Sequence, residues 1–99
     1  MKIIEENIYS IAELCKKFKV HKLYAFGSVI TKNFNDNSDI DLLVNFKEDQ
    51  NSDFFLIFFD FIYALEDLLG RKIDLVDESA ISNSFFKEQL LSTRKLIYR

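Results

Sequence analysis

The sequence predicts one domain of the α/β (α+β) class, with a small mixed β-sheet of about four strands and helices packed on it. Its length of 99 residues suits a single domain over 1–99. Stretches with helical spacing of apolar residues alternate with short apolar runs of strand length, in the order α-β-(short α)-β-α-β-α-β. Hydrophobic residues make up 48% of the chain and charged residues 29%, which is typical of a globular rather than a disordered protein.

The first half of the chain is expected to supply a helix, two strands and a turn. Residues 3–18 form the helix, because apolar side chains recur there on one helical face: Ile4, Ile8, Ile11, Leu14, Cys15 and Phe18. The short apolar run 23–26 ends at Gly27 and predicts a buried strand that leads into a short helix. The turn signal NFNDNS at 33–38 precedes a second strand at 39–46.

The second half begins with a phenylalanine-rich helix over 53–69. Ser52 and Asp53 can cap its start, and Gly70 suits the position after its last turn. Three further elements follow: a strand at 72–76, a helix at 84–91 and a strand at 95–98. The phenylalanine-rich helix is apolar on more than one face, so either its neighbours cover it entirely or one face is an interface. We favour an interface, with a second copy of the chain or with a partner protein.

Charge and cysteine content exclude several classes of protein. The formal net charge is −3, so direct nucleic-acid binding is not expected. A local lysine run is interpreted as a solvated helix end: Lys16, Lys17, Lys19 and Lys22. The single Cys15 excludes an intramolecular disulfide and a cysteine zinc site, and we expect it in the core. The acidic start lacks the apolar run of a signal peptide, and the longest apolar stretch, 54–59, is too short to cross a bilayer. A cytoplasmic protein without membrane contact is expected.

Two aspartates mark the start of the predicted second strand. Side chains alternate along a strand, so Asp39 and Asp41 point the same way while Ile40 points into the core. At about 5 Å and an effective dielectric constant of about 20, two carboxylates repel each other by roughly 3 kcal/mol. A hard divalent cation removes this penalty, and oxygen ligands suit Mg²⁺.

A third aspartate, Asp74, stands in the middle of the apolar strand KIDLV. If this strand lies beside the one with Asp39 and Asp41, the three carboxylates converge into a two-metal site suited to displacement at phosphorus. Gly27 lets the backbone approach a phosphate, and Ser28 offers a hydroxyl. Asp77 falls on the opposite face of the strand and is interpreted as a cap of the following loop.

The motif FGS, ten further residues and DID, followed by a later strand aspartate, resembles the minimal nucleotidyltransferase branch of the polymerase-beta-like superfamily. The resemblance extends from Leu23 to the terminal KLIYR and implies the polymerase-beta-like nucleotidyltransferase fold. It further implies that Asp39, Asp41 and Asp74 hold Mg²⁺, two ions when nucleotide is bound. Asp74 would also help to deprotonate an attacking hydroxyl.

The resemblance also implies a substrate and a partner. Gly27 and Ser28 would hold the phosphates of ATP. Many members of this branch are antitoxins paired with a HEPN ribonuclease toxin, and some transfer AMP to a tyrosine of that toxin. Members commonly read G-S-x-A-R-G, whereas this chain has Thr31 and Lys32 at the arginine and second glycine positions. Lys32 is a candidate substitute for the phosphate-binding arginine, although a lysine lacks the bidentate fork of a guanidinium group.

Two functional hypotheses follow from the sequence. The first is Mg²⁺-dependent transfer of AMP from ATP to a hydroxyl of a HEPN-type partner. The second is an antitoxin that neutralises its partner by contact alone, which the Thr31–Lys32 departure and the phenylalanine-rich helix favour. A small-molecule nucleotidyltransferase is a weaker reading, because such enzymes need a further domain to hold the acceptor.

Overall fold

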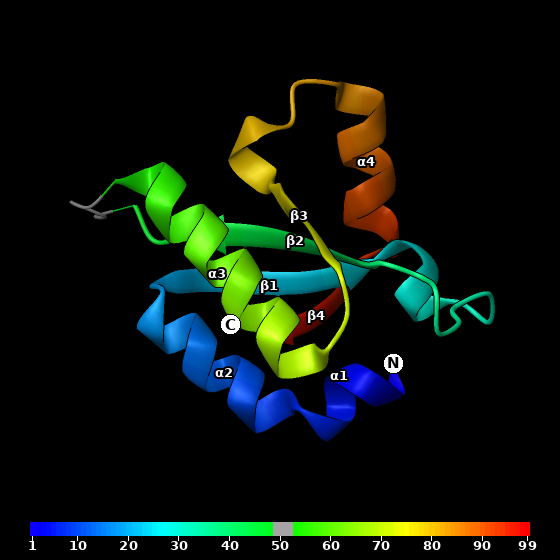
Figure 1. The fold of residues 1–99 in the computed structure, drawn as a ribbon. Helices are drawn as coiled ribbons and strands as arrows, with labels where there is room; N and C mark the ends of the chain where they lie inside the picture. Colours follow the sequence, from blue (N-terminus) through cyan, green and yellow to red (C-terminus); the bar gives the residue numbers. More distant parts are fainter. Residues whose placement is uncertain (49–52) are drawn as a thin grey trace.

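The computed structural model describes residues 1–48 and 53–99, and its centre is a four-stranded sheet (Figure 1). The strand order is β3-β2-β1-β4, and the strands are β1 (Val20–Phe26), β2 (Ile40–Phe46), β3 (Ile73–Asp77) and β4 (Lys95–Tyr98). β1 runs antiparallel to both β2 and β4, whereas β2 and β3 run parallel. The predicted mixed sheet with packed helices is therefore confirmed.

The prediction of one continuous helix over 3–18 is wrong. The structure divides this segment into α1 (Lys2–Glu6) and α2 (Ile8–Lys17). Asn7 lies between them with φ −116° and ψ 16°, and its side-chain amide donates to the Ile3 carbonyl oxygen at 2.8 Å. Asparagine side chains compete for nearby main-chain groups in this way, which interrupts a helix. The apolar periodicity survives the break, because side chains from both helices are buried in the same core.

The helix α3 (Phe54–Leu69) connects the parallel strands β2 and β3, and it packs beside α2 on one side of the sheet (Figure 1). Parallel neighbours need such a crossover. The predicted N-cap is confirmed for Asp53, whose carboxylate accepts a hydrogen bond from the Phe55 amide at 3.0 Å, while Ser52 lies outside the described residues. Gly70 ends the helix in the left-handed region with φ 65°, as the sequence predicts.

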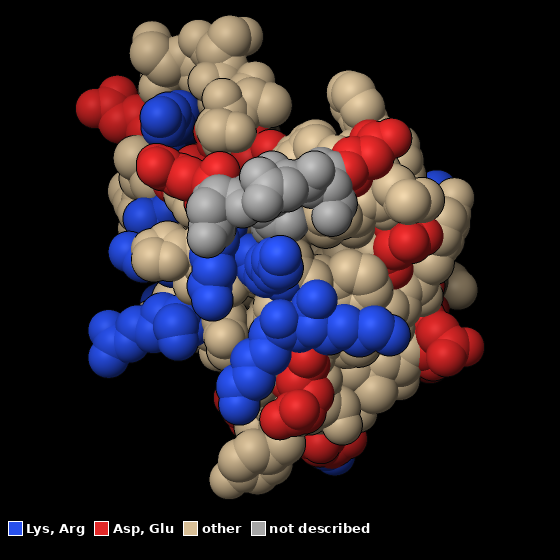
Figure 2. Space-filling model, turned by 90° about the vertical axis from the view of Figure 1, so that its left-hand side faces the viewer, with Lys and Arg blue, Asp and Glu red and all other residues tan. Residues whose placement is uncertain are grey.

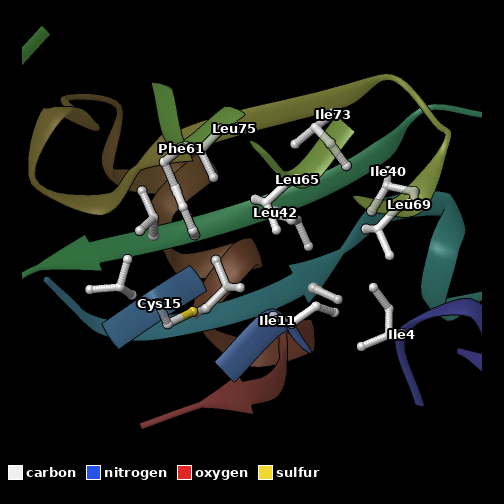
Figure 3. Packing of buried hydrophobic residues seen from close by; sticks show 14 of the residues in the cluster. Ile4, Ile11, Cys15, Ile40, Leu42, Phe61, Leu65, Leu69, Ile73 and Leu75 are labelled. Carbon is white, nitrogen blue, oxygen red and sulfur yellow. The ribbon is translucent and has the colours of Figure 1, made fainter. Parts of the chain in front are cut away.

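The main core lies between the sheet and the helices α1, α2 and α3. Phe61 and Leu65 of α3 meet Leu42 of β2 and Cys15 of α2 there, and all four side chains are fully buried (Figure 3). The predicted core position of Cys15 is confirmed, and burial raises the pKa of its thiol to about 12.

One face of α3 is not covered by the described part of the chain. The exposed side chains are Phe54, Phe55, Leu56, Phe59 and Tyr63. An apolar face is thus left over, as the sequence predicts, and its assignment to an interface stays a prediction.

The opposite face of the sheet carries a second, more polar layer. Leu43 of β2 and Leu90 of α4 (Ser84–Thr93) are buried, but neither belongs to the main core. The Arg94 guanidinium group lies 3.8 Å from the centre of the Tyr24 ring and 2.8 Å from Glu78 Oε1, and Asn45 donates to Glu78 Oε2 at 2.8 Å. These contacts join the end of α4 to the centre of the sheet.

Two short 3₁₀ helices follow strands. The first, Gly27–Ile30, comes directly after β1 and confirms the predicted short helix. The second, Glu78–Ala80, comes after β3, and the Asp77 carboxylate accepts from the Ser79 amide at 3.0 Å. The predicted capping role of Asp77 is therefore confirmed.

Lysine and arginine side chains gather on the side of the molecule where α2 ends and β1 begins (Figure 2). Lys16 and Lys17 close α2 and are exposed, and Lys16 lies 3.6 Å from Glu13 in an exposed pair. An exposed pair of this kind contributes little to stability. In the described ranges, no helix has both the length and the apolar character needed to cross a bilayer.

Candidate active site

The register of the parallel strands decides where the aspartates meet. Asp41 of β2 and Asp74 of β3 are direct partners, and Asp41 is also opposite Phe26 of β1. Because side chains alternate along each strand, paired residues emerge on the same face. Ile40 and Leu42 point into the main core, so Asp41 and Asp74 point to the polar face. The strand neighbourhood on which the predicted convergence depended is therefore present.

The pKa of Asp41 shows how closely the acids interact. It is raised above its ordinary value, first by burial and then by the negative charges of Asp74 and Asp39. A hydrogen bond between the Asp41 and Asp74 carboxyl groups raises it further. Among residues 1–48 and 53–99, no basic side chain forms an ion pair with these acids. The site therefore concentrates negative charge that the described chain leaves uncompensated.

Asp39 occupies a different position from the other two acids. β2 begins at Ile40, so Asp39 lies one residue before the strand, and its side chain is exposed. Its charge acts on Asp41, and its carbonyl oxygen accepts a long 3.5 Å hydrogen bond from the Ser28 hydroxyl. Ser28 is thus placed beside the start of β2, as a phosphate-binding role would require.

The Asp41 carboxyl group lies against Gly27 and leaves no room for a side chain there. The φ of Gly27, 70°, lies in the left-handed region, and a Cβ at this position would collide with Asp41 Oδ2 and lie 3.2 Å from Asp41 Cγ. Glycine avoids both the steric penalty and the collision. The close approach of the backbone to the acids is therefore built into the strand end.

The residues after the short helix form a local turn. The Thr31 amide and hydroxyl both donate to the Ser28 carbonyl oxygen at 2.9 Å. Thr31 therefore stabilises the end of the 3₁₀ helix and does not copy the arginine of related motifs. Lys32 is exposed, and within the described ranges no ion pair holds it.

Arg71 is a residue that the sequence did not single out. It donates from Nη2 to the carbonyl oxygens of Asn35, at 2.6 Å, and Ser38. Its guanidinium carbon lies 4.5 Å from the centre of the Phe34 ring. No motif marks this arginine, because its partners are main-chain oxygens more than thirty residues earlier in the chain.

The acidic side chains of the site suit a Mg²⁺ ion that binds together with a nucleotide. In the described part of the chain, no group of three His, Cys, Asp or Glu side chains is already assembled as a metal site. Asp41 and Asp74 are paired across two strands, and the charge of Asp39 acts on Asp41. Mg²⁺ is usually bound by one or two carboxylates together with substrate phosphates, rather than by a complete cage of protein ligands. The residues present therefore suit this ion.

The fold and this arrangement define a nucleotidyltransferase. Residues 9–99 match the family model described as Polymerase beta, Nucleotidyltransferase. The chain belongs to this family.

Among curated relatives, the protein adenylyltransferase MntA of Thermococcus cleftensis is 34% identical over 87% of this chain and 81% of its own length. A solved structure of a candidate minimal nucleotidyltransferase is 29% identical, covers 94% of this chain and 91% of its own, and has a TM-score of 0.78. A toxin-antitoxin structure with AMP-PNP is 25% identical, covers 92% of this chain and 72% of its own, and has a TM-score of 0.72.

Proposed function

We propose that this protein is a Mg²⁺-dependent protein adenylyltransferase that transfers AMP from ATP to a tyrosine hydroxyl of a HEPN-family toxin and thereby acts as its antitoxin. The observation that carries the proposal is the Asp41–Asp74 pair across β2 and β3, with Asp39 acting on it and Gly27 and Ser28 beside it. The adenylyltransferase relative and the AMP-PNP complex of the toxin-antitoxin pair support the same activity. ATP as substrate fits a cytoplasmic location.

In this proposal the acids have separate tasks. When bound, Mg²⁺ neutralises the triphosphate and makes its α-phosphorus easier to attack. Asp39, Asp41 and Asp74 hold the ions, and the exposed Asp74 carboxylate also accepts the proton of the attacking hydroxyl. The hydroxyl oxygen forms a bond to the α-phosphorus, the bond to the β-phosphate oxygen breaks, and pyrophosphate leaves.

The phosphate-binding part of the proposal rests on the end of β1. The Gly27 backbone has no side chain that would block a phosphate, and the Ser28 hydroxyl lies beside the start of β2. Exposed Lys32 follows four residues later and supplies a positive charge. A lysine binds phosphate as a point charge, so it can replace part of the missing arginine's contribution but not its bidentate geometry.

A contact-only antitoxin is the second candidate. The position of the family's arginine is occupied by Thr31, whose hydroxyl donates to the Ser28 carbonyl oxygen. No guanidinium group is therefore available there to bind phosphate through two nitrogens. The exposed face of α3, on which Phe55 is 69% and Tyr63 62% exposed, offers an apolar surface for a partner. In that case a change in the acids would leave protection against the toxin intact, whereas Phe55→Glu would remove it.

The test is transfer of label from ATP labelled at the α-phosphate. The purified protein is incubated with Mg²⁺ in a lysate of its host, beside an Asp41→Asn control. We expect one labelled protein band that disappears in the control and whose mass spectrum locates AMP on a tyrosine. Equal labelling by the Asp41→Asn variant would overturn the mechanism. A bound but unlabelled partner would favour the contact-only antitoxin.

A further inference from the structure

Asp39 is the most weakly placed of the three acids, because it precedes β2 and is exposed. The loop before it, 33–38, is polar apart from Phe34 and contains turn residues. The hydrogen bonds within the loop are local. The main-chain amide of Asn37 donates to Asn35 Oδ1 at 2.8 Å, and the main-chain amide of Asn35 donates to Ser38 Oγ at 3.1 Å. Such bonds shape the loop but do not fix it relative to the sheet. The position of Asp39 therefore needs an anchor from another segment.

Arg71 supplies that anchor. It lies in the short connection between Gly70 and β3, and its guanidinium group donates to the carbonyl oxygens of Asn35 and Ser38. The same group covers the Phe34 ring at 4.5 Å. Hydrogen bonds from a charged donor are stronger than neutral ones, and a planar guanidinium group loses little freedom when it makes two of them.

A second anchor lies on the other side of Asp39. The Ile40 amide donates to the Lys72 carbonyl oxygen at 2.9 Å. The two anchors come from consecutive residues, Arg71 and Lys72, which directly precede the strand that carries Asp74. Asp39 is thus held between two contacts from the segment that also sets the position of Asp74.

We propose that Arg71 is a positioning residue that fixes the main chain at Asp39, so that its carboxylate joins Asp41 and Asp74 in binding a divalent cation. The inference rests on the proposed function. In the described ranges Arg71 forms no ion pair with the three acids, so it does not compete with the cation for them. Its guanidinium group donates instead to carbonyl oxygens of the loop.

The alternative is that Arg71 merely stabilises the connection between α3 and β3. Lys72 provides a matched control, because it is exposed and carries the same charge at the next position, and its bond to Ile40 uses only its main chain. Lys72→Ala therefore removes one positive charge and keeps both anchors of Asp39. Arg71→Ala removes one positive charge and one anchor.

The experiment is a titration of the purified chain with Mn²⁺ in the presence of AMP-PNP, with free Mn²⁺ followed by electron paramagnetic resonance. Loss of a residue that orients a metal ligand typically weakens metal binding by about ten-fold to a hundred-fold. We expect Arg71→Ala and Arg71→Met, which can donate to neither carbonyl oxygen, each to weaken Mn²⁺ binding by at least about ten-fold. Lys72→Ala is expected to stay within about two-fold of the wild type, since it keeps both anchors.

Two outcomes would overturn the inference. One is a folded Arg71→Ala protein that binds Mn²⁺ as tightly as Lys72→Ala does. The other, which decides the matter if Arg71→Ala does not fold, is an Arg71→Met protein with wild-type affinity, because methionine can fill the space beside the Phe34 ring but donates to neither carbonyl oxygen. Failure of the wild type and of Lys72→Ala to bind Mn²⁺ would instead overturn the proposed function, and the inference with it.

Discussion

The two faces of the sheet are built from side chains of opposite kind. On the face covered by α2 and α3, residues such as Phe61, Leu65 and Leu42 are fully buried, whereas among the described residues no polar or charged residue is fully buried. On the other face, Asp41 and Asp74 are partners across β2 and β3, and Arg94 pairs with Glu78. The first face gains stability from removing apolar surface from water. The second face lowers the stability of the fold, because it holds acidic side chains that repel each other.

This difference predicts that stability and the proposed activity are separable in this small domain. Variants on the apolar face should unfold the protein, whereas variants at the acids should leave it folded and inactive. Four changes test the comparison, and they follow in order of expected effect.

Phe61→Ala should have the largest effect on stability. Its ring is fully buried and lies near the rings of Phe18 and Phe46, with centroid distances of 5.6 Å and 6.1 Å. Removing a buried phenylalanine ring typically costs about 3–5 kcal/mol. Urea unfolding followed by circular dichroism measures the loss. Phe55→Ala is the control on the same helix, since that ring is 69% exposed, and an equal loss in both variants would contradict the assignment of faces.

Asp41→Asn should reduce labelling of the partner by at least about a hundred-fold, because under the proposed function it removes a direct metal ligand. It should also raise the melting temperature of the metal-free protein by a few degrees, since the raised pKa of Asp41 reports burial of its charge and repulsion by Asp74 and Asp39. Differential scanning calorimetry in EDTA measures the second effect. A lower melting temperature would show that these carboxyl groups stabilise the fold.

Gly27→Ala and Gly70→Ala form a matched pair. Both glycines have a left-handed backbone conformation, with φ 70° and 65°, so each substitution by alanine should cost roughly 1–2 kcal/mol of strain. Only at Gly27 does the new Cβ meet a carboxyl group, that of Asp41, because no heavy atom lies within 4 Å of the corresponding position at Gly70. We expect Mn²⁺ and AMP-PNP binding, measured by calorimetric titration, to fall in Gly27→Ala alone. Equal binding by both variants would separate Gly27 from the site.

Glu78→Gln should have the smallest effect, about 1–2 kcal/mol at neutral pH. The pKa of Glu78 is lowered from its ordinary value of 4.5, first by the hydrogen bond from Asn45 and then by Arg94, against an opposing effect of burial. A lowered folded-state pKa stabilises the protein above the ordinary value, and this contribution is lost as the pH falls through the folded-state pKa. The unfolding free energy of the wild type should therefore approach that of Glu78→Gln as the pH falls below about 4.5. A constant difference between the two proteins down to acid pH would show that the charge of Glu78 is not the cause.

Local chemistry explains why much of this protein could be predicted from its sequence. Asp53 and Gly70 mark the two ends of α3 by their side chain and backbone preferences, and both predictions are confirmed. The same kind of local preference was missed at Asn7, where the apolar spacing of the segment concealed the break between α1 and α2. The motif around Gly27 and the DID segment placed Asp41 correctly on β2, because alternation along a strand depends only on neighbouring residues, whereas Asp39, predicted on the same strand, lies one residue before it.

What the sequence by itself determined is the order of the strands and main helices along the chain, the burial of the α2 and α3 faces, and the chemical character of the candidate acids. Only the tertiary structure decided that β3 lies parallel to β2 with Asp74 opposite Asp41, and that Arg71 reaches the loop before Asp39. The physical reason is the distance along the sequence between the residues that interact. Helix caps and strand alternation arise from residues a few positions apart, whereas the pairing of β2 with β3 and the Arg71 contacts join residues more than thirty positions apart, and they arise only when the whole core packs.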